Sequence, residues 1–269
     1  MKFTVQHETV YYYTLPVHYS IQQLRLTPRL EPHQRVLSWD IDAPGRLRRF
    51  VDAYGNVTHT IVLTAPHNQI RIAVRGVLEI EPLVNGRLPV TSDTPGTALS
   101  PLVYTVATPL TAVDETVRTF AAQHLAPGKR SADFVALAEA ICGAVQYESG
   151  ITEVTSTAAQ ALAIGRGVCQ DHAHLFIACC RAAGVPARYV SGYVHPGDTP
   201  EAASHAWADV WVDGEGWVSV DITHRGYTQE RHCRLAIGRD YMSAAPVRGV
   251  RTGGGEELLE VHVTVRSEQ

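Results

Sequence analysis

The chain has 269 residues, 45% of them hydrophobic, and a formal net charge of −4, so we expect one or two globular domains with a sizeable core. The balance is slightly acidic and no long run of Lys and Arg occurs, which argues against a nucleic-acid-binding surface. No run of about eighteen apolar residues is present and the N-terminus becomes polar early, so we expect neither a membrane span nor a signal peptide.

Residues 1–85 predict an N-terminal domain of short β-strands. Several segments alternate between apolar and polar residues or are rich in β-branched and aromatic residues, and Pro and Gly separate them. Gly55-Asn56 has the composition of a tight turn between two of these segments. They are residues 3–7, 10–13, 37–41, 50–57, 59–63 and 70–80. Repeated short strands of this kind predict an antiparallel β-sandwich.

Residues 86–109 are rich in Pro, Gly, Ser and Thr, a composition that commonly marks a domain boundary, so we interpret them as a linker. Residues 110–269 then predict a second domain, in which helices pack on an antiparallel sheet. Helical spacing of apolar residues appears first, and strand patterns follow. The predicted helices are residues 113–121, 134–145, 158–164 and 169–183, and the predicted strands are residues 187–194, 205–212, 217–221 and 258–265. The whole chain is therefore expected to be an α+β protein.

Cys169 follows the turn Gly165-Arg166-Gly167 and opens a predicted helix. A thiol at a helix N-terminus faces unpaired backbone N–H groups and the positive end of the helix dipole. Both favour the thiolate, which is the nucleophilic form of cysteine. A free cysteine is otherwise commonly a small buried hydrophobe, but its position and its downstream partners favour a catalytic interpretation of Cys169.

Two downstream residues complete this interpretation. His205 stands near the start of one predicted strand and Asp221 at the end of the next, and residues 213–216 form a hairpin turn between them. A tight hairpin brings such positions roughly opposite each other, within side-chain reach. If the helix that carries Cys169 packs beside this hairpin, the three residues supply a nucleophile, a base and an orienting carboxylate.

The other four cysteines are not predicted to be reactive. Cys142, Cys179 and Cys180 lie in Ala- and Ile-rich helical stretches and are expected in the core, and Cys233 lies in a polar segment without an assigned role. An odd number of cysteines placed in this way does not fit a secreted disulfide framework. We therefore expect reduced thiols and a cytoplasmic protein.

Several His and Cys residues could instead form a metal site. The candidate ligands form two groups in the sequence, Cys169 with His172 and His174, and His224 with His232 and Cys233. On a helix, His174 points away from Cys169 and His172. No Cys-x-x-Cys pair is present and the spacing matches no common structural zinc pattern. We therefore expect neither a metal ion nor an organic cofactor.

Three neighbours of the predicted site have possible supporting roles. His172 is expected to be a partly exposed side chain that lines a cleft. Trp207 lies on the same strand face as His205, where it packs in the core and could wall the cleft. The backbone N–H of Cys169 is a candidate oxyanion donor, and Gln170 and Trp207 are candidates for a second one. Asp171 lies in the first helical turn, where a carboxylate stabilises the helix.

Several motifs together resemble the bacterial transglutaminase-like superfamily. They are GVCQD at residues 167–171, GVPARYVSGY at 184–193, SHAW at 204–207 and VDIT at 220–223. The start of the chain, with YSIQQLRLTP at residues 19–28, is similar to the N-terminal domain of bacterial members, and residues 238–255 are similar to their ends. Many members have an aromatic residue where this chain has His172, and Asn where it has His224.

The resemblance implies a papain-like core with a Cys-His-Asp triad, in which Cys169 is the nucleophile, His205 the general base and Asp221 the orienting carboxylate. It implies acyl transfer from an amide bond of a peptide or protein through a thioester. We expect water to resolve the thioester, as in a peptidase or amidase. Transfer to an amine, as in a transglutaminase, and a non-catalytic binding protein of the same fold are the alternatives. The oligomeric state stays open.

Overall fold

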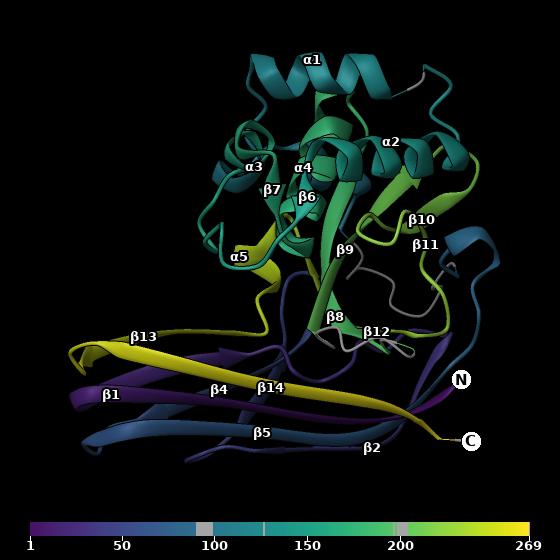
Figure 1. Cartoon of the computed structure of the whole chain (residues 1–269). Coiled ribbons are helices and arrows are strands. Elements are labelled where there is room, and N and C mark those ends of the chain that lie inside the picture. The colour runs from purple at the N-terminus through teal and green to yellow at the C-terminus, as the bar shows by residue number, and fades with distance from the viewer. Residues whose placement is uncertain (90–98, 126, 196, 198–203, 269) are drawn as a thin grey trace.

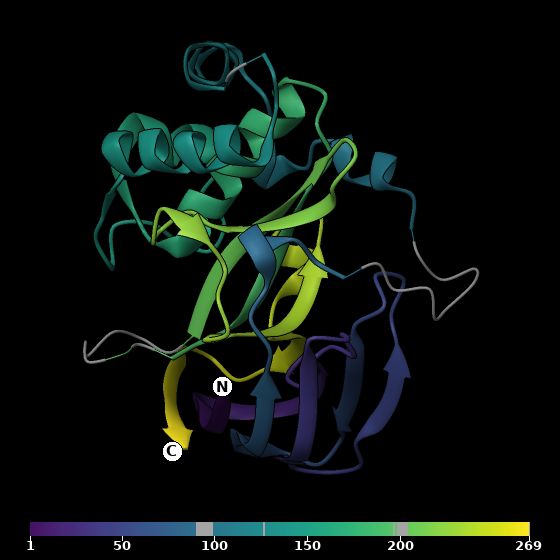
Figure 2. The same ribbon diagram turned by 90° about the vertical axis from the view of Figure 1, so that its right-hand side faces the viewer.

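The structure is a computed structural model, and it describes residues 1–89, 99–125, 127–195, 197 and 204–268. A large curled antiparallel sheet forms one half of the molecule, and a smaller sheet covered by helices forms the other (Figure 1 and Figure 2). The α+β class predicted from the sequence is therefore confirmed. Within the described ranges, no helix is long and apolar enough to cross a membrane.

The large sheet is organised by its central strand, β1 (Lys2–Leu24), whose first part pairs with β5 and whose last part pairs with β4. Its ladder with β5 is interrupted between Tyr12 and Val17, a stretch that contains Pro16, which has no N–H to donate. Because β1 continues past this interruption, the strands belong to one continuous curled sheet, in the order β2-β5-β1-β4-β3, and not to two separate sheets. The other bounds are β2 (Gln34–Asp42), β3 (Arg48–Val51), β4 (Val57–Leu63) and β5 (His67–Ile80).

The end of the chain returns to this sheet. β13 (Val247–Gly253) pairs with the second part of β1, and β14 (Glu257–Glu268) pairs with the first part, which brings the two termini side by side (Figure 1). Residues 110–269 are predicted to form one domain, whereas their last two strands complete the N-terminal sheet. Alternation predicts a strand but not its partner, because pairing is decided by which sheet edge is free in space.

The second half is built around α4 (Cys169–Ala182), which is buried along most of its length. It packs on a five-stranded antiparallel sheet of order β11-β10-β9-β8-β12, where Ala206, Ala208 and Val210 of β9 face it. The strands are β8 (Ala187–Val194), β9 (Ser204–Val212), β10 (Gly216–Asp221), β11 (Gly226–Tyr227) and β12 (His232–Gly238). The remaining elements are α1 (Glu115–His124), α2 (Ser131–Ala144), β6 (Gln146–Tyr147), α3 (Ala158–Ile164), β7 (Arg166–Gly167) and α5 (Tyr241–Ala244).

The predicted linker, residues 86–109, is described in part, because residues 90–98 lie outside the described residues. Its described ends pack on the second half. The Leu88 N–H donates to the Trp217 carbonyl at 2.9 Å. Tyr104, in the 3₁₀ turn Pro101–Thr105, is buried, and its carbonyl accepts a hydrogen bond from the Arg181 guanidinium at 2.9 Å. These ends are therefore held by specific contacts with the second half.

Strands β8, β9 and β12 approach one another closely at Gly192. Gly192 pairs with His205 on β9 and with Arg234 on β12. A Cβ atom at this position would lie 2.1 Å from the Cys233 carbonyl oxygen and 2.5 Å from the Trp207 ring. Only glycine therefore allows Trp207 to lie fully buried beside His205, with ring centroids 6.0 Å apart.

Replacing Gly192 by Ala is expected to lower the free energy of unfolding by about 1–3 kcal/mol or more, because overpacking strains a dense core. Gly143→Ala is the matched control. It lies in α2 with nothing within 4 Å of its added Cβ, so it should raise stability by roughly 0.5–1 kcal/mol. Urea unfolding of both variants measures this, and equal stabilities of the two variants would contradict the packing role of Gly192.

Candidate active site

The N-terminus of α4 is held by Asp171. The Val168 N–H donates to Asp171 Oδ2 at 2.8 Å, and the Thr152 hydroxyl donates to the same oxygen at 2.7 Å. Gly167 leaves room for this carboxylate, because a Cβ there would lie 2.6 Å from Oδ2. Asp171 therefore has the structural role that its position in the first turn predicts. The cap presents the half-buried Cys169 as the first residue of α4.

His205 and Asp221 meet across the β9–β10 hairpin. The ladder ends with Val220 opposite Ala208, so His205 and Asp221 lie diagonally across it and not directly opposite each other. Both side chains are buried, and His205 Nε2 lies 2.9 Å from Asp221 Oδ2 and 3.0 Å from Oδ1. The hairpin thus fixes the orientation of the imidazole ring.

Cys169 contacts the same imidazole. Cys169 interacts with His205 through its charge and its side chain, and both effects raise the pKa of the imidazole. Burial lowers the pKa of His205, but the charge and hydrogen bond of Asp221, together with Cys169, outweigh burial and raise this pKa to about 10. Asp221 and Cys169 therefore both act on the imidazole of His205.

Two further histidines converge on Asp221. His224 Nδ1 lies 2.6 Å and His232 Nε2 lies 2.7 Å from Asp221 Oδ2, and the backbone N–H of His224 donates to Oδ1 at 3.2 Å. Burial raises the pKa of Asp221, but His205 first, and then the other two imidazoles, hold it well below its usual range. We call Asp221 and these three histidines the Asp221 cluster.

The contacts of His224 and His232 with Asp221 are not predicted from the sequence, where both histidines belong to a separate group of possible metal ligands with Cys233. His224 lies three residues after Asp221 in a turn, a spacing that could have indicated contact. His232 enters from β12, which is separated from β10 in the sheet by β9 and β8, so its approach depends on the curvature of the sheet.

The structure corrects the predicted cleft position of His172. This side chain is 1% exposed. Its Nε2 lies 2.9 Å from the Val145 carbonyl and its Nδ1 lies 3.0 Å from Thr223 Oγ1. His172 therefore braces α4 against the turn that follows β10. His172 is buried in the protein interior because α4 is packed on several sides. Helical periodicity predicts one buried face of a helix but does not show that other faces are covered as well.

The two side chains predicted as second oxyanion donors are engaged elsewhere. Gln170 Nε2 donates to the Val154 carbonyl at 3.1 Å. Trp207 is fully buried, and its Nε1 donates to Ser219 Oγ at 3.1 Å. Trp207 therefore packs beside the ring of His205 in the core and does not line an open cleft.

The other four cysteines are buried and free. Burial raises the pKa of Cys179 to about 12 and raises the pKa of Cys142 above its usual value. Cys233 belongs to the hydrophobic core shared by the two halves. Burial therefore keeps these thiols protonated, which separates them from the half-buried Cys169.

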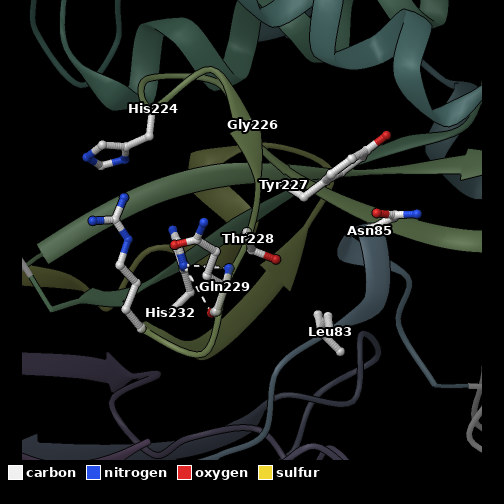
Figure 3. Close-up of a pocket in the computed structure, with 9 residues that line it drawn as sticks. Leu83, Asn85, His224, Gly226, Tyr227, Thr228, Gln229 and His232 are labelled. Atoms are coloured by element: carbon white, nitrogen blue, oxygen red, sulfur yellow. Dashed lines mark hydrogen bonds between the residues drawn. The ribbon is translucent and has the colours of Figure 1, made fainter.

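A pocket of about 260 Å³ adjoins the Asp221 cluster (Figure 3). His224 and His232 form part of its wall, together with residues of the β11–β12 connection and of the segment that follows β5. The rest of the lining is Leu83, Asn85, Gly226, Tyr227, Thr228, Gln229 and Arg231. Cys169 is not among the residues that line this pocket.

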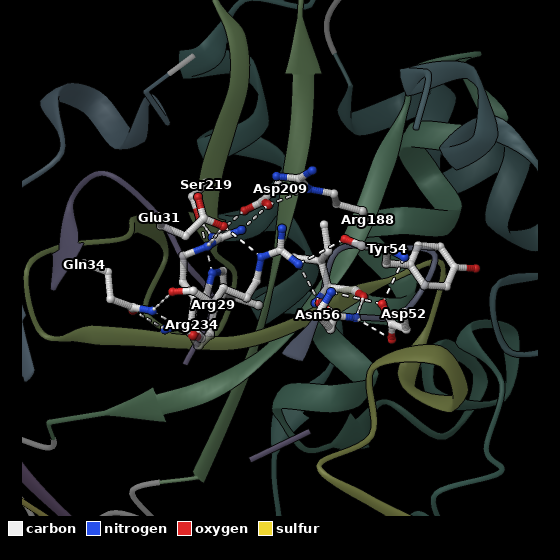
Figure 4. Close-up of polar contacts among 12 residues, drawn as sticks. Arg29, Glu31, Gln34, Asp52, Tyr54, Asn56, Arg188, Asp209, Ser219 and Arg234 are labelled. Carbon is white, nitrogen blue, oxygen red and sulfur yellow. Dashed lines mark hydrogen bonds and ion pairs between the residues drawn. The ribbon is translucent and has the colours of Figure 1, made fainter. Parts of the chain in front are cut away.

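A buried charge network lies on the same sheet face as the Asp221 cluster and joins the two halves (Figure 4). Asp209 Oδ2 lies 2.6 Å from Arg234 Nη2 and 2.7 Å from Arg188 Nε. Arg234 Nε also lies 3.6 Å from Glu31, which Arg29 binds at 2.8 Å. The N-terminal half is therefore joined by ion pairs to the sheet face that carries the Asp221 cluster, and these pairs neutralise charges that would be costly if buried alone.

Family comparisons agree with this architecture. The transglutaminase-like superfamily matches residues 118–222, and the bacterial transglutaminase-like N-terminal region matches residues 3–79. An uncharacterised protein of Mycobacterium leprae is 34% identical over 282 residues, which cover 98% of each chain. An uncharacterised protein of Mycobacterium tuberculosis is 30% identical over 98% of this chain and 92% of its own length. The chain belongs to the transglutaminase-like superfamily.

Two further proteins are similar to this chain. A crystal structure of a candidate cysteine protease from Cytophaga hutchinsonii has a TM-score of 0.79 at 22% identity, over 100% of this chain and 91% of that one. This likeness confirms the fold, including the transglutaminase-like core. A protein-glutamine gamma-glutamyltransferase of Pseudomonas aeruginosa is 33% identical over 101 residues, which are 33% of this chain and 15% of that protein.

Replacing Asp209 by Asn is expected to lower the free energy of unfolding by about 3–5 kcal/mol, because it leaves two buried guanidinium groups without their carboxylate. Glu215→Gln is the control, since its ion pair with Arg87 is largely exposed and such pairs contribute about 0–1 kcal/mol. Urea unfolding near neutral pH measures both. A loss in Asp209→Asn no larger than in the control would contradict the role of the network.

The same pair predicts the direction of acid destabilisation. Burial raises the pKa of Asp209, but the charges of Arg234 and Arg188 lower it well below its ordinary value. The contribution of Asp209 is therefore complete above about pH 4, the pKa of an unfolded Asp, and is lost as the pH falls further. Urea unfolding between about pH 5 and pH 2 should show a shallower acid decline in Asp209→Asn than in the wild type. Parallel declines would contradict this assignment.

Proposed function

We propose that the protein is a cysteine-nucleophile enzyme that cleaves an amide bond of a peptide or protein through a thioester, with water as the acceptor. The observation that supports this best is the imidazole of His205, which lies 2.9 Å from the buried Asp221 carboxylate and interacts with Cys169. A base held between a nucleophile and a carboxylate is the arrangement that activates a thiol for acyl transfer. No cofactor takes part in the proposed reaction.

In the first half of this reaction, the Cys169 thiolate attacks the carbonyl carbon of the amide and forms a C–S bond. Negative charge develops on the carbonyl oxygen, where the backbone N–H of Cys169, at the start of α4, is positioned as a donor. The C–N bond then breaks, and the leaving amine takes the proton from His205. The acyl group remains on Cys169 as a thioester.

In the second half, His205 accepts a proton from water while the water oxygen attacks the thioester carbon. The C–S bond breaks, the carboxylic acid leaves, and the thiolate and the imidazolium are restored. Asp221 holds the imidazole ring and stabilises its positive charge in both halves. Its own charge is secured by burial among donors, as described for the Asp221 cluster.

Transfer to an amine in place of water is the second candidate. It is supported by the similarity of about a third of this chain to a protein-glutamine gamma-glutamyltransferase. The chemistry up to the thioester is identical for the two outcomes, so the same residues serve both. They differ only in the nucleophile that reaches the thioester.

The proposed site of action is the cytoplasm. All five cysteines are free, and four of them are buried in the core. A reducing compartment suits this use of cysteine, because it preserves the thiolate that the reaction needs. The free state of the five cysteines is the observation that supports this location.

Iodoacetamide at about pH 6 is expected to alkylate Cys169 faster than any other cysteine, because His205 stabilises its thiolate while the other thiols are buried. A time course of peptide mapping by mass spectrometry measures this. His205→Ala should abolish the selectivity, and His124→Ala, on the exposed helix α1, should preserve it. Labelling of Cys179 or Cys180 at the rate of Cys169 would refute the activated thiol.

A library of peptides offered with and without small amines should separate the two candidate reactions. Hydrolysis gives a product that has gained water, whereas transamidation gives a product that has gained the amine, and mass spectrometry distinguishes them. Cys169→Ala should form neither product, and His205→Ala should lower kcat/KM by about 10²–10⁴-fold. Turnover by Cys169→Ala at the wild-type rate would overturn the proposed mechanism.

A further inference from the structure

The Asp221 cluster has a second chemical capacity besides orienting a base. It gathers three imidazole nitrogens and one carboxylate, and all four ligand atoms lie within 4.8 Å of one another. His205, Asp221 and His232 are buried, and the side chain of His224 is 26% exposed. We propose that these four side chains form a binding site for a zinc ion.

The donor set fits zinc in kind and number. Zn²⁺ prefers four ligands drawn from imidazole nitrogen, thiolate sulfur and carboxylate oxygen, in tetrahedral geometry. Bonds of about 2.0–2.1 Å place such ligand atoms about 3.3 Å apart. Asp221 Oδ2 already lies 2.6–2.9 Å from each of the three nitrogens. The carboxylate would have to move outward and the rings inward for an ion to replace the shared hydrogen bonds.

The surroundings of His232 suit a metal ligand. A metal-bound histidine usually donates its other ring N–H to a carbonyl or carboxylate, which fixes the ring. His232 Nδ1 lies 3.2 Å from the Gln229 carbonyl oxygen and 3.0 Å from the Gln229 backbone nitrogen. Gln229 can therefore accept from Nδ1 when Nε2 binds an ion, and donate to it when Nε2 carries the proton.

The ion also has an entry route. The pocket of about 260 Å³ is lined by His224 and His232 but not by Cys169 (Figure 3). His224 lies in the turn between β10 and β11, where its ring can adjust without disturbing a strand. An ion can thus reach the cluster through this pocket and leave the thiol unligated. This separates the proposed site from adventitious metal capture by the Cys169–His205 pair.

Occupation of this site would switch the proposed enzyme off. An ion on Nε2 leaves the proton of His205 on Nδ1. Nδ1 then cannot accept a proton from Cys169 or from water. The ion also takes Asp221 away as the partner of the imidazole. This consequence rests on the proposed function, whereas zinc binding itself does not.

Cobalt is a suitable probe, because Co²⁺ takes the same tetrahedral ligands as zinc and absorbs visible light. Untagged protein is treated with EDTA, dialysed and titrated with CoCl₂, and ZnCl₂ is then added in competition. We expect one tetrahedral Co²⁺ per chain, no thiolate-to-cobalt charge-transfer band, and displacement by an equivalent of Zn²⁺. Failure of the wild type to bind, or a spectrum with a thiolate band, would overturn the proposal.

Four variants assign the ligands. His224→Asn and His232→Gln should each weaken cobalt binding at least tenfold, whereas Cys169→Ala and His124→Asn, a histidine on the distant helix α1, should bind as the wild type does. Circular dichroism confirms that each variant is folded. Unchanged binding by folded His224→Asn would overturn the proposal, as would loss of binding in Cys169→Ala.

The regulatory consequence has its own readout. Saturating ZnCl₂ should slow alkylation of Cys169 at least tenfold in the wild type, and excess EDTA should restore the rate. In His224→Asn the same zinc concentration should have little effect. Zinc binding without any change in the alkylation rate would leave the metal site intact but would contradict its control of the thiol, so the two claims fail separately.

Discussion

The buried carboxylate of Asp221 is the constraint around which the site is built. A fully buried charge is tolerated only when donors surround it, and this carboxylate has three imidazoles and a backbone N–H within hydrogen-bond distance. Each donor arrives on a different element: His205 at the start of β9, His224 from the turn after β10, and His232 at the start of β12. Satisfying one charge therefore fixes three parts of the chain relative to one another, and it orients the ring that contacts Cys169.

A second buried carboxylate, Asp209, extends the same logic to the whole molecule. It lies two strand positions beyond Trp207 on the sheet face turned away from α4, where Arg234 and Arg188 neutralise it. Arg234 also forms an ion pair with Glu31 in the N-terminal half. The curled sheet thus contributes to the site because it packs on the sheet face that carries His205 and Asp221 and supplies Glu31 to the charge network there. Apolar contacts with Tyr193, Cys233 and Leu235 complete this interface.

The proposed reaction and the proposed zinc site use one set of residues in two ways. Protons on the three imidazoles make Asp221 an acceptor and leave His205 free to serve Cys169. An ion in their place converts the same nitrogens and oxygen into ligands and withdraws the base. The pocket beside His224 and His232 makes the exchange accessible from solvent (Figure 3).

The sequence by itself determined the local features: Cys169 at the first residue of a helix after a Gly-rich turn, the capping role of Asp171, and the hairpin that unites His205 with Asp221. Periodicity and turn chemistry are properties of neighbouring residues, so they can be read from the chain. The tertiary structure alone decided the long-range features. It buried His172, brought His232 to Asp221 across a curved sheet, and returned β13 and β14 to the N-terminal half, because these depend on which surfaces and sheet edges meet in space and not on residues close in sequence.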